Sequence, residues 1–123
     1  MNNNTTKVLI ADDSAFMRTV LKDIVLQSKW AGSEVLEAEN GEDALELFKQ
    51  HKPDLIVLDI IMPKKDGIQV LRDIGGQARA VVIVSSVGKE KAIEEAKNLG
   101  VRDYIVKPFD AQNVISVIDK LFS

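Results

Sequence analysis

The sequence contains no cysteine and only one histidine. Without cysteine, neither a disulfide framework nor a thiolate metal site is possible, and a single histidine disfavours a zinc site. No apolar run approaches the roughly 20 residues that a membrane-spanning helix needs. The polar start, Met1 to Thr6, lacks the charged and apolar regions of a signal peptide. We therefore expect a cytoplasmic protein that is neither secreted nor inserted into a membrane.

The sequence has fewer basic than acidic residues, with 16 Lys and Arg residues and 19 Asp and Glu residues. No basic patch stands out, so nucleic acid is not expected as a partner. The apolar fraction of 46% and the charged fraction of 28% are ordinary for a globular protein. A length of 123 residues suits one domain. We predict a disordered tail at residues 1–6 and a single domain at residues 7–123.

Five short apolar runs alternate with five amphipathic segments. The runs are rich in branched residues and have the length of strands, whereas the segments between them carry apolar residues at helical spacing. Strict alternation predicts an α/β fold, (βα) five times, with a parallel sheet and helices on both faces. Charges within the second run place it near a sheet edge. The expected strands are residues 8–11, 34–38, 55–59, 81–84 and 104–106.

The segment after the first strand shows the helical spacing clearly. Phe16, Val20 and Ile24 recur at intervals of four, with Met17 and Leu21 beside them. This pattern predicts an amphipathic helix whose apolar face includes all five side chains.

Four of the predicted strands end in polar residues. Asp12-Asp13 follow the first strand, Asp59 ends the third, and Ser85 and Lys107 follow the last two. The carboxyl ends of parallel strands lie along one sheet edge, where such folds bind ligands. Neighbouring strands are about 4.8 Å apart, so these carboxylates approach closely and repel one another. Lys107 supplies one compensating charge, and a Mg²⁺ ion with oxygen ligands is expected to supply the rest.

Each of these residues also has a purely structural explanation. Asp12-Asp13 could be an acid pair favoured by the dipole of a helix N-terminus. Asp59 alone could be an N-cap, Lys107 a surface cation, and Ser85 a polar residue leaving the sheet. Their combination favours chemistry, because a carboxylate can act as a nucleophile toward phosphorus and become an aspartyl phosphate. A metal ion and a lysine would then stabilise the transferring oxygens.

The motifs in combination resemble the receiver domain of two-component response regulators, in particular the single-domain chemotaxis type. The resemblance spans about Lys7 to Phe122. It rests on Asp12-Asp13, Asp59 with Pro63 and Gly67 after it, Ser85, and Lys107-Pro108-Phe109. It implies a flavodoxin-like fold whose five parallel strands have the order 2-1-3-4-5.

The resemblance also implies roles for the residues at the strand ends. Asp59 would be the phosphoacceptor. Asp13, with Asp12 acting partly through water, would hold Mg²⁺ together with Asp59 and the backbone carbonyl of Ile61. Lys107 would pair with the phosphoryl group.

Further roles follow from the same resemblance. Ser85 would be the switch hydroxyl, at a position where threonine is more frequent, and Tyr104 the switch aromatic. Ser86 stands where a smaller residue is usual. The Lys107–Pro108 peptide bond is expected to be cis.

The implied function is a phosphorylation switch that catalyses only its own phosphoryl transfer and dephosphorylation. A histidine kinase would be the donor, and a monomer is expected. The signal would pass through the face of the fourth helix, fifth strand and fifth helix to a target protein, for which the flagellar motor switch is a candidate.

Two other functions have to be weighed against the switch. A Mg²⁺-dependent phosphohydrolase with an aspartyl phosphate intermediate usually carries an acid two residues after its nucleophile, where this chain has Ile61. A binding module that works without phosphorylation typically loses an acid or the lysine, and this chain keeps both.

Overall fold

The computed structural model describes residues 5–122. We predicted a disordered tail at residues 1–6, and residues 1–4 of it lie outside the described residues. Thr6 is held in place, because its backbone carbonyl accepts the N–H of Glu34 at 2.9 Å. None of the described helices is long and apolar enough to cross a membrane.

Five parallel strands form one sheet in the order β2-β1-β3-β4-β5, which confirms the α/β, flavodoxin-like prediction. β2 lies at an edge, as its mixed charges indicate. The strands are β1 (Lys7–Ala11), β2 (Glu34–Ala38), β3 (Leu55–Leu58), β4 (Val81–Ser85) and β5 (Asp103–Val106).

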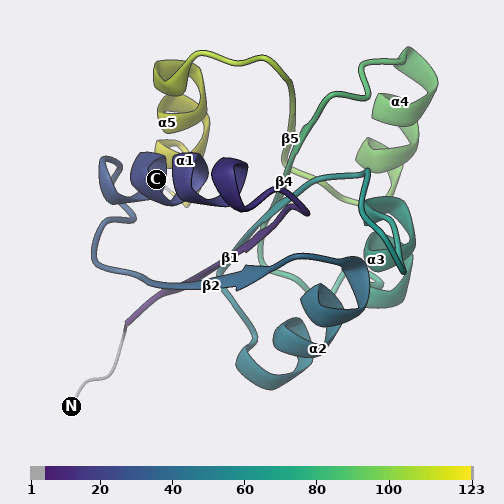
Figure 1. Ribbon diagram of the computed structural model, residues 1–123, viewed down its shortest axis with the longest axis horizontal. Helices are drawn as coiled ribbons and strands as arrows, with labels where there is room; N and C mark the ends of the chain where they lie inside the picture. The colour runs from purple at the N-terminus through teal and green to yellow at the C-terminus, as the bar shows by residue number, and fades with distance from the viewer. Residues whose placement is uncertain (1–4, 123) are drawn as a thin grey trace.

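Helices cover both faces of the sheet, with α1 and α5 on one face and α2, α3 and α4 on the other (Figure 1). Alternate side chains of the central strands point to opposite faces, and each face has its own apolar core. Leu9 packs in the core under α2 and α3, whereas Val8 and Ile10 pack under α1 and α5. The helices are α1 (Ala15–Leu26), α2 (Gly41–His51), α3 (Gly67–Ile74), α4 (Glu90–Asn98) and α5 (Ala111–Asp119).

α3 is short because its sequence fixes both ends. The side chain of Asp66 accepts the N–H of Gln69 at 2.9 Å, and the side chain of Gln69 accepts the N–H of Asp66 at 3.0 Å. This reciprocal pair satisfies two N–H groups that a helix start leaves free. At the other end Gly75 has φ 61°, a left-handed conformation that stops the helix.

One core prediction is wrong, because Phe16 is 75% exposed. Leu21 and Ile24 are buried and Met17 and Val20 half-buried, as expected. A spacing of four residues drifts by about 40° per step around a helix, so Phe16 is rotated by about 80° from Ile24. Phe16 also lies in the first turn of α1, beside the open carboxyl edge of the sheet.

Candidate functional site

Three carboxylates meet at the carboxyl edge of the sheet. Asp12 and Asp13 follow the end of β1, and Asp59 follows the end of the neighbouring β3. One oxygen from each lies within 4.8 Å of the other two. Asp12 and Asp59 are buried, whereas Asp13 is exposed. The site therefore opens toward solvent on the side of Asp13.

Lys107 reaches this cluster from β5, two strands away from β3. Its Nζ lies 2.7 Å from Oδ2 of Asp12 and 3.0 Å from Oδ2 of Asp59. The backbone N–H of Lys107 donates to the carbonyl of Ser85 at 2.8 Å, so the end of β4 fixes where the lysine leaves the sheet. The peptide bond between Lys107 and Pro108 is cis. One cation thus joins the two buried acids.

Backbone N–H groups hold the second oxygen of each buried acid. Ser14 donates to Oδ1 of Asp12 at 2.9 Å, and Ile61 donates to Oδ1 of Asp59 at 3.1 Å. Both acids therefore have both oxygens engaged, which fixes their rotamers in an open site.

Gly67 lets the loop after β3 fold tightly against Asp59. Its N–H donates to the carbonyl of Ile60 at 2.8 Å. A Cβ at this position would lie 2.4 Å from the backbone oxygen of Asp59, which no side chain can tolerate. The glycine is therefore required by this close approach.

Burial and neighbouring groups both shift the pKa values of Asp12 and Lys107. Burial is the largest influence on the pKa of Asp12 and raises it. Hydrogen bonds from Lys107 and from the Ser14 N–H lower the pKa, and the charge of Asp59 raises it. The net effect is a raised pKa. Burial alone would lower the pKa of Lys107, but its hydrogen bonds to Asp12 and Asp59 raise the pKa above 10.5. Lys107 is consequently a cation at neutral pH.

Ser85 and Tyr104 lie on adjoining strands and are linked through Val87. The fully buried Ser85 hydroxyl accepts the Val87 N–H at 3.3 Å, and the Tyr104 hydroxyl donates to the Val87 carbonyl. Burial, and then the charge of Asp59, raise the pKa of Tyr104 above 10.0. Ser86 is exposed beside this loop.

The donor set suits a hard divalent cation. Three carboxylates and one lysine leave the cluster with net negative charge. The side-chain atoms of the three acids that could coordinate a metal ion are all oxygens. The Ile61 side chain is 55% exposed and apolar, so only its backbone can contribute a ligand.

Sequence reasoning missed Arg18 in α1. Its Nη1 donates to the backbone carbonyl of Asp12 at 2.8 Å, and its Nε pairs with Oε1 of Glu37 in β2 at 3.0 Å. The guanidinium thereby braces the end of β1 against β2 and α1. A side-chain bond to a carbonyl leaves no signature in a single sequence, so nothing in the residue pattern pointed to it.

Residues 8–119 match the family model of the response regulator receiver domain. The chain is 44% identical to the chemotaxis protein CheY of Bacillus subtilis, over 93% of this chain and 95% of that protein. It is 40% identical to CheY of Thermotoga maritima, over 94% of this chain and 96% of that protein.

Solved structures show the same likeness. A chain in the CheX-CheY-BeF3-Mg²⁺ complex from Borrelia burgdorferi superposes with a TM-score of 0.87 at 33% identity, over 96% of this chain and 90% of that one. The response regulator domain of Thermotoga maritima CheB gives a TM-score of 0.78 at 36% identity, over 94% of this chain and 91% of that one. The fold, the acids at the strand ends and these relatives agree: the chain belongs to the response regulator receiver domain family, whose CheY-like members act in phosphorylation-dependent signalling.

Proposed function

We propose that this chain is a phosphorylation-activated switch in which Asp59 accepts a phosphoryl group from the phosphohistidine of a histidine kinase. The observation that carries the proposal is the Lys107 ammonium, 2.7 Å from Asp12 and 3.0 Å from Asp59. A lysine that only stabilises the fold through an ion pair needs a single acid as its partner. Here a second buried acid and the exposed Asp13 give an excess of negative charge that only a bound cation would balance.

The transfer needs an oxygen nucleophile and a cation for the transferring group. A carboxylate oxygen of Asp59 would form the O–P bond as the P–N bond to the imidazole breaks. The imidazole nitrogen keeps the electron pair and takes a proton from water. Lys107 already contacts Asp59, so its N–H groups can follow the phosphoryl oxygens as charge develops on them.

Asp13 and Asp59 would hold a Mg²⁺ ion, with the backbone carbonyl of Ile61 and, partly through water, Asp12. The three carboxylates fit this role because their oxygens lie within 4.8 Å of one another. When bound, the ion supplies positive charge that stabilises the phosphoryl oxygens during transfer.

The hydrogen bonds around Val87 suggest how the phosphoryl group is sensed. The Ser85 hydroxyl accepts the Val87 N–H and can donate its own proton to a phosphoryl oxygen. The loop that carries Val87 also accepts the Tyr104 hydroxyl. Drawing Ser85 toward the phosphate would therefore move the loop and Tyr104 together.

The output surface would be the face formed by α4, β5 and α5. Val106 of β5 is 40% exposed there, an apolar contact for a partner. The CheY relatives suggest chemotaxis, and we propose the flagellar motor switch as the target, reached in the cytoplasm by a monomer. Binding of the purified motor-switch protein of the same organism, compared with and without beryllofluoride and Mg²⁺, tests this assignment. Equal binding in both states would exclude it.

Labelling with acetyl phosphate tests the proposed phosphoacceptor. With Mg²⁺ the wild-type chain should incorporate radiolabel, and Asp59→Asn should incorporate none. Asp23→Asn is the matched control, because Asp23 is an exposed acid on α1 away from the cluster. Undiminished labelling of Asp59→Asn would refute the assignment.

The hydrolase alternative is disfavoured by the apolar, exposed side chain of Ile61 two residues after Asp59. We propose that the chain turns over only its own phosphoryl group. An assay with a generic phosphomonoester should show no release of phosphate beyond the rate in buffer, and multiple turnovers would establish an enzyme instead.

A further inference from the structure

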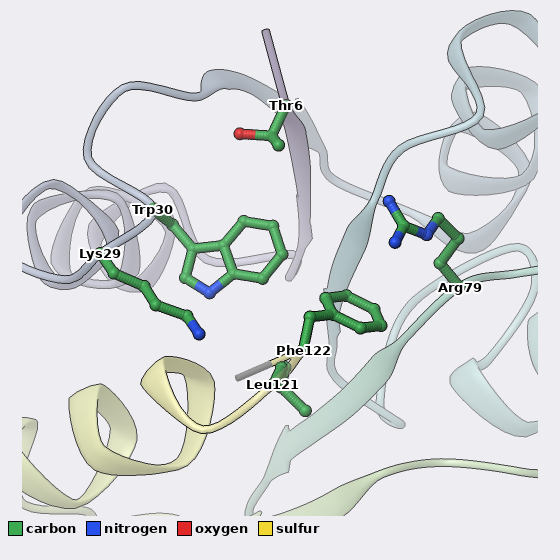
Figure 2. Close-up of a pocket in the computed structure, with 6 residues that line it drawn as sticks. All are labelled: Thr6, Lys29, Trp30, Arg79, Leu121 and Phe122. Atoms are coloured by element: carbon green, nitrogen blue, oxygen red, sulfur yellow. The ribbon is translucent and has the colours of Figure 1, made fainter. Parts of the chain in front are cut away.

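A cavity lies at the end of the sheet opposite the carboxylates. Its volume is about 270 Å³. Thr6 directly precedes β1 and Arg79 lies two residues before β4, so the cavity opens at the amino ends of the strands (Figure 2). The lining residues are Thr6, Lys29, Trp30, Arg79, Leu121 and Phe122.

Two aromatic rings build one wall of this cavity. The ring centroids of Trp30 and Phe122 are 6.1 Å apart, and the ring planes make an angle of 61°. The Trp30 Nε1–H donates to the carbonyl of Ile118 at 2.7 Å, which fixes the buried indole. Phe122 is 45% exposed, so part of its ring meets solvent beside the buried indole. The exposed part of the Phe122 ring offers an apolar contact for a flat group.

The rim of the cavity is positively charged. The Arg79 guanidinium carbon lies 4.5 Å from the centroid of the Phe122 ring, and that of Arg102 lies 5.3 Å from it. None of the lining residues within the described part of the chain is acidic. Arg79 pairs with Asp54 at 2.8 Å. The Lys29 ammonium forms no ion pair within residues 5–122. An anionic group would therefore find the Lys29 ammonium without an ion-pair partner among the described residues, whereas at Arg79 it would compete with Asp54.

From this combination we propose that the cavity binds a small planar aromatic carboxylate. A ligand ring would pack against the exposed part of the Phe122 ring beside Trp30, with its carboxylate facing the cationic rim formed by Lys29 and Arg79 (Figure 2). The volume lies just below the range of about 300–1,000 Å³ for drug-sized ligands, which limits the ligand to one or two rings. This site is separate from the acids at the other sheet edge.

Titration of the full-length chain with 2-naphthoate, followed by ¹H–¹⁵N NMR, tests the proposal. Trp30 is the only tryptophan, so its indole N–H gives a single cross-peak that reports the cavity wall. We expect a saturable shift of this cross-peak with a Kd of about 1 mM or below. The uncharged 2-naphthamide should bind about tenfold more weakly, because it lacks the anionic group.

Two variants separate the cavity from general charge effects. Arg79→Gln and Lys29→Gln should each weaken 2-naphthoate binding about three- to tenfold, while Lys91→Gln, an exposed cation on α4, should leave it unchanged. Both lining cations are exposed, so these variants should keep the fold.

Three results would overturn the proposal: no saturable Trp30 shift, equal binding of acid and amide, or unchanged affinity in both lining variants. Binding should persist in Asp59→Asn, because the cavity does not depend on phosphorylation.

Discussion

The Nζ of Lys107 lies closer to Asp12 than to Asp59, at 2.7 Å against 3.0 Å. In the unphosphorylated chain the lysine is thus shared between an acid proposed to help hold Mg²⁺ and the acid proposed to react. It therefore lowers the negative charge of the site before any metal ion arrives. A bound cation and Lys107 would compete for the same carboxylates, whereas a phosphoryl group would attract both.

Lys107→Ala should separate these two effects. Without the ammonium the acid cluster is more negative, so its Mg²⁺ affinity should rise several-fold, while phosphoryl transfer should slow by about tenfold or more. Isothermal titration with Mg²⁺ and labelling with acetyl phosphate measure the two quantities. Lys91→Ala should change neither. A parallel loss of Mg²⁺ affinity and labelling would point to a general collapse of the site.

Arg18→Ala removes the brace on the backbone of Asp12. We expect the Mg²⁺ affinity to fall about tenfold, because partners that orient ligands typically contribute tenfold or more. Glu37→Gln should have a smaller effect, since Arg18 keeps its 2.8 Å bond to the carbonyl of Asp12. If the two variants lose the same affinity, the bond to the carbonyl is not what matters.

Gly41→Ala tests the contact between α2 and the loop after β3. A Cβ at Gly41 would lie 1.9 Å from the backbone oxygen of Lys65, so helix and loop must separate. We expect the free energy of unfolding to fall by about 1–3 kcal/mol in urea denaturation. Gly32→Ala is the control, because nothing lies within 4 Å of its added Cβ. Equal stability of the two variants would contradict the packing.

Tyr104 is the only tyrosine, so absorbance at 295 nm follows its ionisation directly. The midpoint should lie above 10.0 in the folded chain. Above pH 10 the unfolded chain loses this proton first, so the unfolded state binds fewer protons and stability falls as pH rises. Asp59→Asn should lower the midpoint only slightly, since burial is the larger cause. A midpoint at or below 10.0 would mean that the ring is not buried as described.

Much of the site could be predicted because it depends on where strands end. The β1 and β3 runs are unbroken apolar segments followed by acids, and adjacency of parallel strands brings Asp12, Asp13 and Asp59 together. The order of the strands followed from the family resemblance. The end of α3 is likewise encoded locally, because Gly75 adopts the left-handed conformation that stops a helix.

What escaped prediction depends on side chains that cross between elements. The bond from Arg18 to the carbonyl of Asp12 and the ring of Phe122 beside Trp30 join segments far apart in the chain, and no local pattern encodes them. Phe16 was misplaced because a spacing of four residues drifts around the helix, and because the first turn of α1 lies beside the open carboxyl edge of the sheet.

The central claim is that Asp59 carries the phosphoryl group, and borohydride trapping tests it most directly. Borohydride reduces an acyl phosphate to an alcohol, so phosphorylated aspartate becomes homoserine, which peptide mass spectrometry can locate. After treatment with acetyl phosphate and Mg²⁺ we predict homoserine at position 59 alone, and none when EDTA replaces Mg²⁺. Homoserine at position 12 or 13, or the absence of any reduced residue in a labelled sample, would contradict the account.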